Sequence, residues 1–321
     1  MVSPPTNASN GEVAVFGGQS GDITRNDDLL AGSRHQSFAE AVSCLGTPRM
    51  AGATDRAGEN ERTMLDREGI ARLHDLTGRV ALVTGGSRGI GLAVAQAFAA
   101  QGAKVVVSSR KARACDEAAA AIQEAGGEAL SVAAHVGEPE DLRNLVATAV
   151  KSFGGIDVLV NNAANPLALP IGEITAEAFA KSFEVNVRGP LFLFQACLEH
   201  LLDSEHAAVV NVISAGAFLH TPGGSLYGAG KAALLHFTRS MAAEFADQGI
   251  RVNALAPGPT DTTMVRKTGS RAVASMAQST RLKRLAEVDE MVGAVLYLAS
   301  DASSYMTGQC LTVDGGLVPA R

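Results

Sequence analysis

From about Leu76 onward, short β-branched apolar runs alternate with longer segments of helical periodicity. This alternation limits the possible folds more than any other feature of the chain. The first run is Arg79–Thr84, and the first helical segment is Gly89–Ala100, whose apolar residues recur every three or four positions. Strict strand–helix alternation predicts a parallel sheet, because right-handed crossovers place the connecting helices on both of its faces.

The expected strands are apolar without polar alternation, which suits burial on both faces of a sheet. In chain order they are Arg79–Thr84, Lys104–Ser108, Ala129–Ala133, Ile156–Val160, Ala207–Ile213, Arg251–Leu255 and Cys310–Val313. The expected helices are Gly89–Ala100, Ala112–Ala125, Glu138–Phe153, Thr175–Leu202, Ser225–Gln248 and Val288–Ser300. We therefore predict an α/β fold with a doubly wound, seven-stranded parallel sheet of Rossmann type.

The first 71 residues have a different character from the rest of the chain. Ser3–Gly11 and Gly17–Asp28 are polar and turn-rich, without a sustained period of a strand or a helix. We expect residues 1–71 to form a disordered N-terminal extension, and residues 72–321 to form one domain. A translation start at Met50 or Met64 is the alternative explanation for this segment.

Composition excludes several classes of protein. The net charge of −6, the aromatic content of 4% and the absence of Trp argue against a nucleic-acid partner. No apolar run reaches the ~18 residues that cross a bilayer, so we expect no membrane span. The four cysteines have neither disulfide-framework nor metal-site spacing: Cys44, Cys115, Cys197 and Cys310. Reduced thiols, and a C-terminus (Pro319-Ala320-Arg321) that is no peroxisomal signal, suggest a cytoplasmic protein.

A glycine-rich loop, TGGSRGIG at residues 84–91, joins the first expected strand to the first expected helix. Such a loop exposes backbone N–H groups at the positive end of the helix dipole, where they can bind a pyrophosphate. An ordinary tight turn is the alternative, but the position within the first βαβ unit favours a dinucleotide-binding domain. The expected cofactor contacts in this loop are Gly85, Ser87, Arg88, Gly89, Ile90 and Gly91.

The end of the second expected strand indicates which dinucleotide binds. An acidic residue there would bind the 2′-hydroxyl of NAD, but this sequence has Ser109, Arg110 and Lys111 instead. A guanidinium offers paired donors to a phosphate, and Arg88 of the glycine loop can approach the same place. We therefore expect NADP(H), with NAD(H) as the alternative if Arg110 and Lys111 simply begin a helix in solvent.

A second group of polar residues indicates acid–base chemistry. Tyr227 and Lys231 are four residues apart, so on a helix they share one face. A tyrosine with a pKa of about 10 is a poor base at neutral pH, and a nearby ammonium would lower that pKa. Ser214, at the end of the fifth expected strand, can hold a carbonyl oxygen beside the phenol. A Tyr-x-x-x-Lys pair also occurs on ordinary helix surfaces, but here the glycine loop and Ser214 accompany it.

Together these motifs resemble the short-chain dehydrogenase/reductase family, in its form of about 250 residues, over residues 76–318. The motifs are TGGSRGIG (84–91), NNAA (161–164), Asn186, Ser214, Tyr227-x-x-x-Lys231 and Pro257-Gly258. The resemblance implies that Tyr227 is the general acid in carbonyl reduction and the base in alcohol oxidation. It further implies that Lys231 binds the nicotinamide ribose, that Ser214 orients the substrate oxygen, and that Asn186 holds a water behind Lys231.

The resemblance also implies further cofactor contacts, at Val136, Asn162, Ala163, Pro257, Gly258, Thr260 and Thr262. The stretches SSRK (108–111), HVGEPED (135–141) and GGIDVLVNNAANP (154–166) look like NADPH-dependent carbonyl/retinal reductases and their bacterial relatives. One departure from the wider family is His135, which stands where an Asp commonly precedes Val136 and contacts adenine.

We therefore expect an oxidoreductase that transfers a hydride between NADP(H) and a carbonyl or secondary alcohol substrate. The alternatives are a 3-oxoacyl-[acyl-carrier-protein] reductase, an NAD-dependent secondary alcohol dehydrogenase, and a non-catalytic cofactor-sensing protein. The intact Asn, Ser, Tyr and Lys set argues against the last. Residues 166–171, 215–224 and 259–284 are expected to determine the substrate, the last as a mobile lid.

Basic residues in the expected lid would suit an acyl carrier protein: Arg266, Lys267, Arg271, Arg281, Lys283 and Arg284. Two long helices, Thr175–Leu202 and Ser225–Gln248, are apolar on more than one face. In the family that the chain resembles, such helices pair between subunits, so we expect a homo-oligomer, most simply a tetramer.

Overall fold

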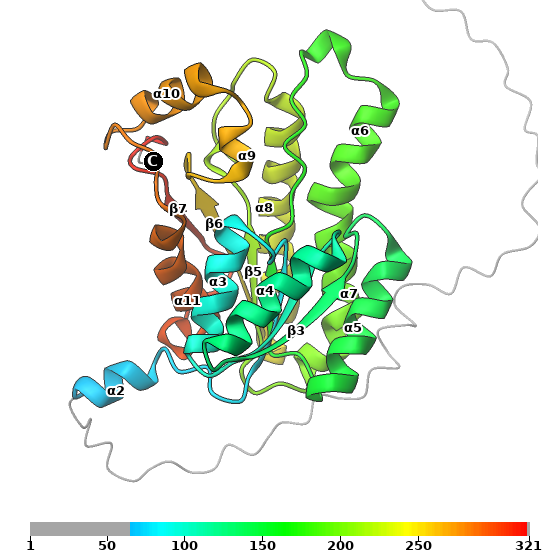
Figure 1. Ribbon diagram of the computed structural model, residues 1–321, viewed down its shortest axis with the longest axis vertical. Coiled ribbons are helices and arrows are strands. Elements are labelled where there is room, and N and C mark those ends of the chain that lie inside the picture. Colours follow the sequence, from blue (N-terminus) through cyan, green and yellow to red (C-terminus); the bar gives the residue numbers. More distant parts are fainter. Residues whose placement is uncertain (1–64, 320–321) are drawn as a thin grey trace, which may run out of the picture. The chain divides into compact units, whose positions relative to one another are not determined.

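The computed structural model describes residues 65–319, which contain a seven-stranded, fully parallel sheet in the order β3-β2-β1-β4-β5-β6-β7 (Figure 1). Every expected strand is present and the predicted fold class is confirmed. The strands are β1 Val80–Thr84, β2 Lys104–Ser109, β3 Glu128–Ala133, β4 Val158–Asn161, β5 Ala208–Val212, β6 Arg251–Pro257 and β7 Cys310–Val313.

Helices cover both faces of the sheet. Successive strand side chains point to opposite sides, so each face has its own core cluster. Ala81 and Val83 pack in one cluster with residues of α3, α4 and α11, whereas Val80 and Leu82 pack in the other, with residues of α5 and α7. The helices are α3 Gly89–Ala100, α4 Ala112–Glu124, α5 Pro139–Phe153, α6 Ala176–Phe183, α7 Gly189–Leu202, α8 Ser225–Phe245, α9 Thr263–Arg266, α10 Ser270–Ser279 and α11 Val292–Ala299.

Most of the predicted N-terminal extension, residues 1–64, lies outside the described residues. Its last part is helical, contrary to the expectation of disorder through residue 71: α2 spans Arg67–Arg72. The cause is local, since Asp66 caps the helix and its carboxylate accepts a hydrogen bond from the Gly69 N–H at 2.7 Å.

A further expectation needs correction. The single helix predicted over Thr175–Leu202 is divided into α6 and α7 by a π-helical turn at Glu184–Arg188. Pro190 follows this turn and has no N–H to continue a regular α-helical ladder. The segment 259–284, expected to be a mobile lid, contains α9 and α10. Its base is held by a backbone contact, since the N–H of Ala286, two residues after the segment, donates to the Pro259 carbonyl at 2.9 Å.

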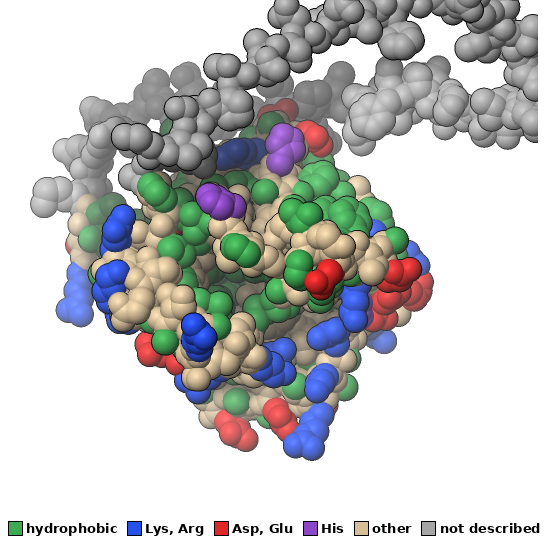
Figure 2. All heavy atoms as spheres, turned by 90° about the horizontal axis from the view of Figure 1, so that it is seen from above, with side chains coloured by type: hydrophobic (Ala, Val, Ile, Leu, Met, Phe, Trp, Pro, Cys, Tyr) green, Lys and Arg blue, Asp and Glu red, His purple; other side chains and the backbone are tan. Residues whose placement is uncertain are grey.

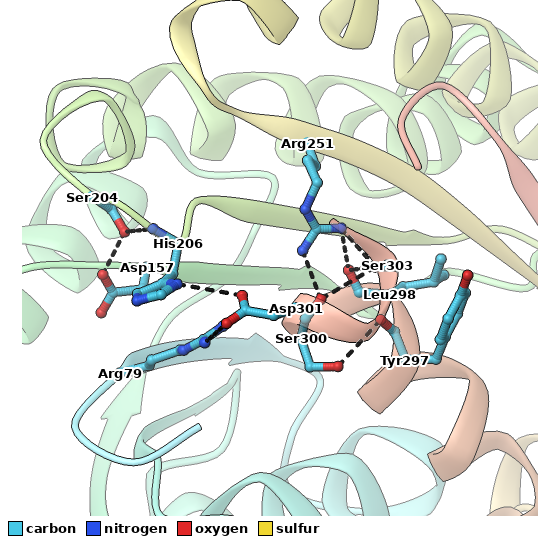
Figure 3. Close-up of polar contacts among 10 residues, drawn as sticks. All are labelled: Arg79, Asp157, Ser204, His206, Arg251, Tyr297, Leu298, Ser300, Asp301 and Ser303. Carbon is cyan, nitrogen blue, oxygen red and sulfur yellow. Dashed lines mark hydrogen bonds and ion pairs between the residues drawn. The ribbon is translucent and has the colours of Figure 1, made fainter. Parts of the chain in front are cut away.

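The amino ends of the strands are joined to the C-terminal part of the domain by side-chain contacts, shown in Figure 3. Arg79, just before β1, donates to the Asp301 carboxylate at 2.7 Å, and the His206 ring nitrogen lies 3.3 Å from the other carboxylate oxygen. Arg251, at the start of β6, donates to the carbonyls of Leu298 and Ser300, where α11 ends.

A second contact set at the same edge fixes β1 to β4. One carboxylate oxygen of Asp157, just before β4, accepts from the Val80 N–H at 2.7 Å, and the other accepts from the Ser204 hydroxyl at 2.5 Å. We call Arg79, Asp157, Ser204, His206, Arg251 and Asp301 the amino-edge clasp. Its charged groups are used for holding strands and helix ends together.

Candidate active site

The sequence-predicted site residues meet at the opposite, carboxyl edge of the sheet. The glycine loop follows β1, Ser109 ends β2, Val136 follows β3, Asn162 follows β4, Ser214 follows β5 and Gly258 follows β6. In this strand order the connections leave β1 and β4 in opposite directions, and open α/β sheets bind ligands in the crevice at that point. Seen from above in Figure 2, this face is hollowed near its middle, where hydrophobic side chains gather.

The glycine loop is shaped for close approach of a ligand backbone. Gly85 has φ +64°, a left-handed conformation that favours glycine. A Cβ atom at Gly91 would lie 2.4 Å from the Gly85 carbonyl oxygen and 2.4 Å from the Asn162 amide nitrogen. Any side chain at residue 91 would therefore push α3 away from the loop and distort the N-terminus of that helix.

Thr84 holds the glycine loop against the end of β4, a role that the sequence analysis missed. Its hydroxyl donates to the Val160 carbonyl at 3.2 Å and accepts from the N–H groups of Asn162 and Ala163 at 3.0 and 3.1 Å. The Asn162 amide in turn donates to the Thr84 carbonyl at 2.9 Å and the Gly85 carbonyl at 3.2 Å. A lone hydroxyl ending an otherwise apolar strand was the available signal.

A basic, hydrogen-bonding region lies between the glycine loop and the end of β2. The Ser87 hydroxyl donates to the Ser109 hydroxyl at 2.9 Å. Arg88 and Arg110 are exposed, and neither forms an ion pair within residues 65–319. The first turn of α4 begins after Lys111 and has no side-chain cap, so its N–H groups are open. All of these features favour the binding of an anion between the glycine loop and the end of β2.

His135 lies in a loop that its own backbone and α5 hold. Its N–H donates to the Asp141 carboxylate at 2.8 Å, and its ring nitrogen Nδ1 accepts from the Gly137 N–H at 3.2 Å. Val136, the expected adenine contact, is buried beside it. The histidine therefore has a structural role in shaping this loop, and Asp141 is a carboxylate that supports the loop from the first turn of α5.

The segment after β6 reaches back to the glycine loop. Pro257 ends the strand, the Gly258 N–H donates to the Val313 carbonyl at 2.9 Å, and the buried Thr260 hydroxyl donates to the Gly258 carbonyl at 3.1 Å. Thr262 caps α9, and its methyl group lies 3.3 Å from the place of a Cβ at Gly89. Thr262 thus borders the glycine loop, and Pro257, Gly258 and Thr260 lie in the chain between the end of β6 and this threonine.

Ser214, Tyr227 and Lys231 come together where β5 and α8 meet. Lys231 is almost fully buried, and its ammonium donates to the Val212 carbonyl at 2.7 Å. Its Nζ lies 5.8 Å from the centre of the Tyr227 ring, so both side chains occupy one face of α8 as predicted. The Ser214 hydroxyl accepts from the Gly216 N–H at 3.1 Å, which fixes its orientation.

The pKa values of this group differ from the simple expectation. Burial raises the pKa of Tyr227 to about 12, and interaction with the Ser214 hydroxyl lowers it by less. Burial also lowers the pKa of Lys231 to about 7. Desolvation therefore dominates the pKa of both groups, and no lowering by the Lys231 ammonium offsets it at the phenol. Tyr227 nevertheless remains partly exposed to solvent.

Asn186 sits in the π-helical turn, fully buried against α8. Its amide oxygen accepts from the Asn165 N–H at 3.0 Å, and its amide nitrogen donates to the Asn165 carbonyl at 2.9 Å and the Ser182 hydroxyl at 3.2 Å. Both amide hydrogens are therefore engaged in holding the chain after β4. Asn165 was not singled out from the sequence, because nothing in its local pattern shows that its backbone is the partner.

Comparison with known proteins gives the family. A family model described as "Enoyl-(Acyl carrier protein) reductase" matches residues 85–318. The human protein named "Dehydrogenase/reductase SDR family member 4" is 41% identical over 256 residues, which cover 79% of this chain and 92% of that protein. The chain belongs to the short-chain dehydrogenase/reductase family. Members of this family are oxidoreductases that bind a nicotinamide cofactor.

Two other members of the short-chain dehydrogenase/reductase family are informative. A 3-oxoacyl-[acyl-carrier-protein] reductase from a Synechocystis strain is 37% identical over 245 residues, covering 76% of this chain and 98% of that protein. A solved structure from Beutenbergia cavernae, assigned as an NAD(P)-dependent gluconate 5-dehydrogenase with NADP bound at low occupancy, has a TM-score of 0.73 and 32% identity. It covers 77% of this chain and all of that one.

Neither a membrane span nor a metal cluster is found in the part of the chain that the structure describes. None of the helices within residues 65–319 is both long and apolar enough to cross a bilayer. Within the same residues, no three His, Cys, Asp or Glu side chains are grouped so that they could hold a metal ion.

Proposed function

We propose that this member of the short-chain dehydrogenase/reductase family interconverts a carbonyl compound and a secondary alcohol, using NADP(H) as its cofactor. The observation that carries the proposal is the position of Tyr227. Its phenol lies beside Ser214 and on the same helix face as the buried Lys231, at the sheet edge where the glycine loop opens. In this proposal Asn186, Ser214, Tyr227 and Lys231 act together.

Tyr227 donates a proton to the carbonyl oxygen during reduction and accepts it back during alcohol oxidation. Its raised pKa keeps the phenol protonated at neutral pH, which suits the reductive direction. The Ser214 hydroxyl, held by the Gly216 N–H, orients the substrate oxygen toward the phenol. The nicotinamide cofactor, when bound, supplies or accepts the hydride.

Lys231 stabilises the phenolate that forms as Tyr227 loses its proton. With a pKa of about 7, the lysine is poised to take up a proton when a negative charge develops nearby. The Val212 carbonyl keeps Nζ in place for this role and for binding the nicotinamide ribose. Asn186 supports the group from behind by tying the chain after β4, at Asn165, to the turn that packs on α8.

The residues around the glycine loop fit an NADP cofactor. The tight backbone at Gly91 leaves the loop N–H groups open to a pyrophosphate, and Ser109, Arg110 and Arg88 offer donors to a 2′-phosphate. The open N-terminus of α4 adds further N–H groups at the same place. The B. cavernae relative with bound NADP supports this assignment by similarity.

Substitution of Tyr227 by Phe tests the proposal. The variant should bind NADPH and unfold like the wild type, but lose turnover by at least about 100-fold, because the proton donor is gone. The measurement is NADPH absorbance with a panel of aldehydes, ketones and quinones, and Tyr305→Phe is the control, since Tyr305 is fully exposed. Near wild-type reduction by Tyr227→Phe would contradict the assignment.

Reduction of a 3-oxoacyl group on an acyl carrier protein is a second candidate, favoured by the Synechocystis relative. Arg266 and Arg284 are already paired with Asp261 and Glu290. Lys267, Arg271 and Arg281 have no acidic partner within residues 65–319 and are left for an acidic carrier. The test compares one 3-oxoacyl group on the carrier protein and on a small thiol. Equal kcat/KM values would exclude a carrier-specific enzyme.

A further inference from the structure

Three side chains form a hydrogen-bonded row behind the end of β2. The Ser87 hydroxyl donates to the Ser109 hydroxyl at 2.9 Å, and the Ser109 oxygen lies 3.1 Å from the Cys115 sulfur. The same sulfur lies 3.5 Å from the Ser109 carbonyl oxygen. Cys115 is fully buried and belongs to the first turns of α4, the helix that begins beside Arg110.

The hydrogens of this row can be arranged in two ways. In one, the Cys115 thiol donates to the Ser109 carbonyl and accepts the Ser109 hydroxyl proton. In the other, the thiol donates to the Ser109 hydroxyl oxygen, which already accepts from Ser87, and the Ser109 proton is left free. Only the second arrangement leaves the Ser109 hydroxyl free to donate to a group outside the row. An anion bound beside Ser109 therefore favours this arrangement.

A second buried thiol shows what is particular about Cys115. Cys197 on α7 is equally buried, but it packs in the apolar cluster beneath the other face of the sheet, and burial raises its pKa strongly. Within residues 65–319, no hydrogen bond to the Cys197 sulfur is present, whereas Cys115 reaches two oxygens of Ser109. Packing alone therefore accounts for Cys197, but it does not account for the hydrogen bonds of Cys115 to Ser109.

We propose that Cys115 is a positioning residue for cofactor choice. Its thiol orients the Ser109 hydroxyl so that this hydroxyl donates a hydrogen bond to the 2′-phosphate of NADP(H). This inference rests on the proposed function, because it requires that the phosphate bind beside Ser109 and Arg110. It extends the phosphate site by one residue that does not touch the cofactor.

The test measures kcat/KM with NADPH and with NADH for three variants. Cys115→Val removes the hydrogen bonds to Ser109 while keeping similar volume, and should lower the NADPH/NADH ratio of kcat/KM by about three- to tenfold, as for loss of one ordinary hydrogen bond between neutral groups. Cys115→Ser keeps a donor and an acceptor, and should retain the ratio within about twofold. Cys197→Val controls for the general effect of replacing a buried thiol and should leave the ratio unchanged.

Binding of 2′-AMP, compared with that of 5′-AMP, reports the phosphate site without requiring turnover. Cys115→Val should weaken the binding of 2′-AMP more than that of 5′-AMP. If the valine variant does not fold, Cys115→Ala provides the same measurement. Equal losses with both cofactors, or an unchanged ratio in the Val and Ala variants, would overturn the role of Cys115 while leaving the NADP assignment intact. A wild type without preference for NADPH would overturn the NADP assignment itself, and the inference with it.

Discussion

The two edges of the sheet use similar side chains in opposite ways. At the amino edge, Arg79 is buried and Arg251 is half-buried, and they bind Asp301 and the carbonyls at the end of α11. At the carboxyl edge, Arg88 and Arg110 are exposed and have no ion pair within residues 65–319. The difference separates charges that stabilise the fold from charges that are left for a ligand.

Serine hydroxyls at the two edges show the same contrast. Ser204 in the amino-edge clasp donates to Asp157, a carboxylate that also accepts from the backbone of β1. Within residues 65–319, the Ser109 hydroxyl at the carboxyl edge forms hydrogen bonds only with another hydroxyl and a thiol, which are weak and rearrangeable partners. A site that must exchange ligands keeps such groups, whereas a structural contact uses full charges and fixed backbone partners.

The largest expected effect is at Lys231, where the chemistry of the carboxyl edge conflicts with stability. Lys231→Met should reduce turnover by at least about 100-fold, and in the oxidative direction the pH midpoint of kcat/KM should move upward, because the phenolate loses its nearby cation. The free energy of unfolding should instead increase, because the cost of burying the ammonium is removed. The measurements are the pH profile of alcohol oxidation and thermal unfolding at several pH values.

The sign of the stability change follows from the lowered pKa of Lys231. The folded chain holds the lysine at a pKa of about 7, against 10.5 as its ordinary value, so the unfolded chain binds more protons between these two pH values. Wild-type stability should therefore rise with pH across that window, and the cost of the buried ammonium is fully present below pH of about 7. Lys231→Met should lack this rise; a variant with the wild-type pH dependence would contradict the assignment.

Breaking the amino-edge clasp should cost stability without cost to chemistry. Arg79→Met leaves the Asp301 carboxylate without its main partner and should lower the free energy of unfolding by about 1–2 kcal/mol, a reduced figure because Asp301 is partly exposed. The measurement is urea unfolding together with kcat/KM. Arg113→Met is the control, since its pair with Glu117 is exposed and should contribute about 0.5 kcal/mol or less. A large fall in kcat with stability intact would show that the two edges are not separate in function.

Removing a cation from the carboxyl edge should have the converse effect. Arg110→Ala should lower the NADPH/NADH ratio of kcat/KM by about tenfold and leave unfolding unchanged, because a guanidinium–phosphate contact is lost and no internal ion pair is broken. Steady-state kinetics with both cofactors gives the ratio. Arg113→Ala, also exposed at the start of α4, serves as the matched control and should have no effect on the ratio.

The smallest expected effect concerns acid stability of the clasp. Burial raises the pKa of Asp301, but the hydrogen bonds and charges of Arg79 and His206 together lower it by more, so the net pKa lies below its ordinary value. Its contribution to stability is therefore present above the ordinary carboxyl pKa and is lost as pH falls through the lowered one. Asp301→Asn should flatten this part of the stability–pH curve. An unchanged curve would show that the Arg79 contact contributes nothing measurable.

Local pattern predicted the strands and most helices because both depend on short-range periodicity. Gly89–Ala100 and Cys310–Val313 occur with the predicted bounds. The pattern failed where a distant contact or a single residue overrode it. The break in the long helix at Glu184–Arg188 places Asn186 against Asn165, and the helices α9 and α10 within the segment expected to be a lid were not predicted.

By itself, the sequence determined the parallel α/β architecture, the glycine loop after β1 and the shared helix face of Tyr227 and Lys231, because each follows from spacing along the chain. The tertiary structure decided how these groups are solvated and what they touch. Burial raises the tyrosine pKa and lowers the lysine pKa, and Cys115 meets Ser109 across a helix–strand contact. Desolvation and partner distances depend on packing between segments, which spacing in one segment does not encode.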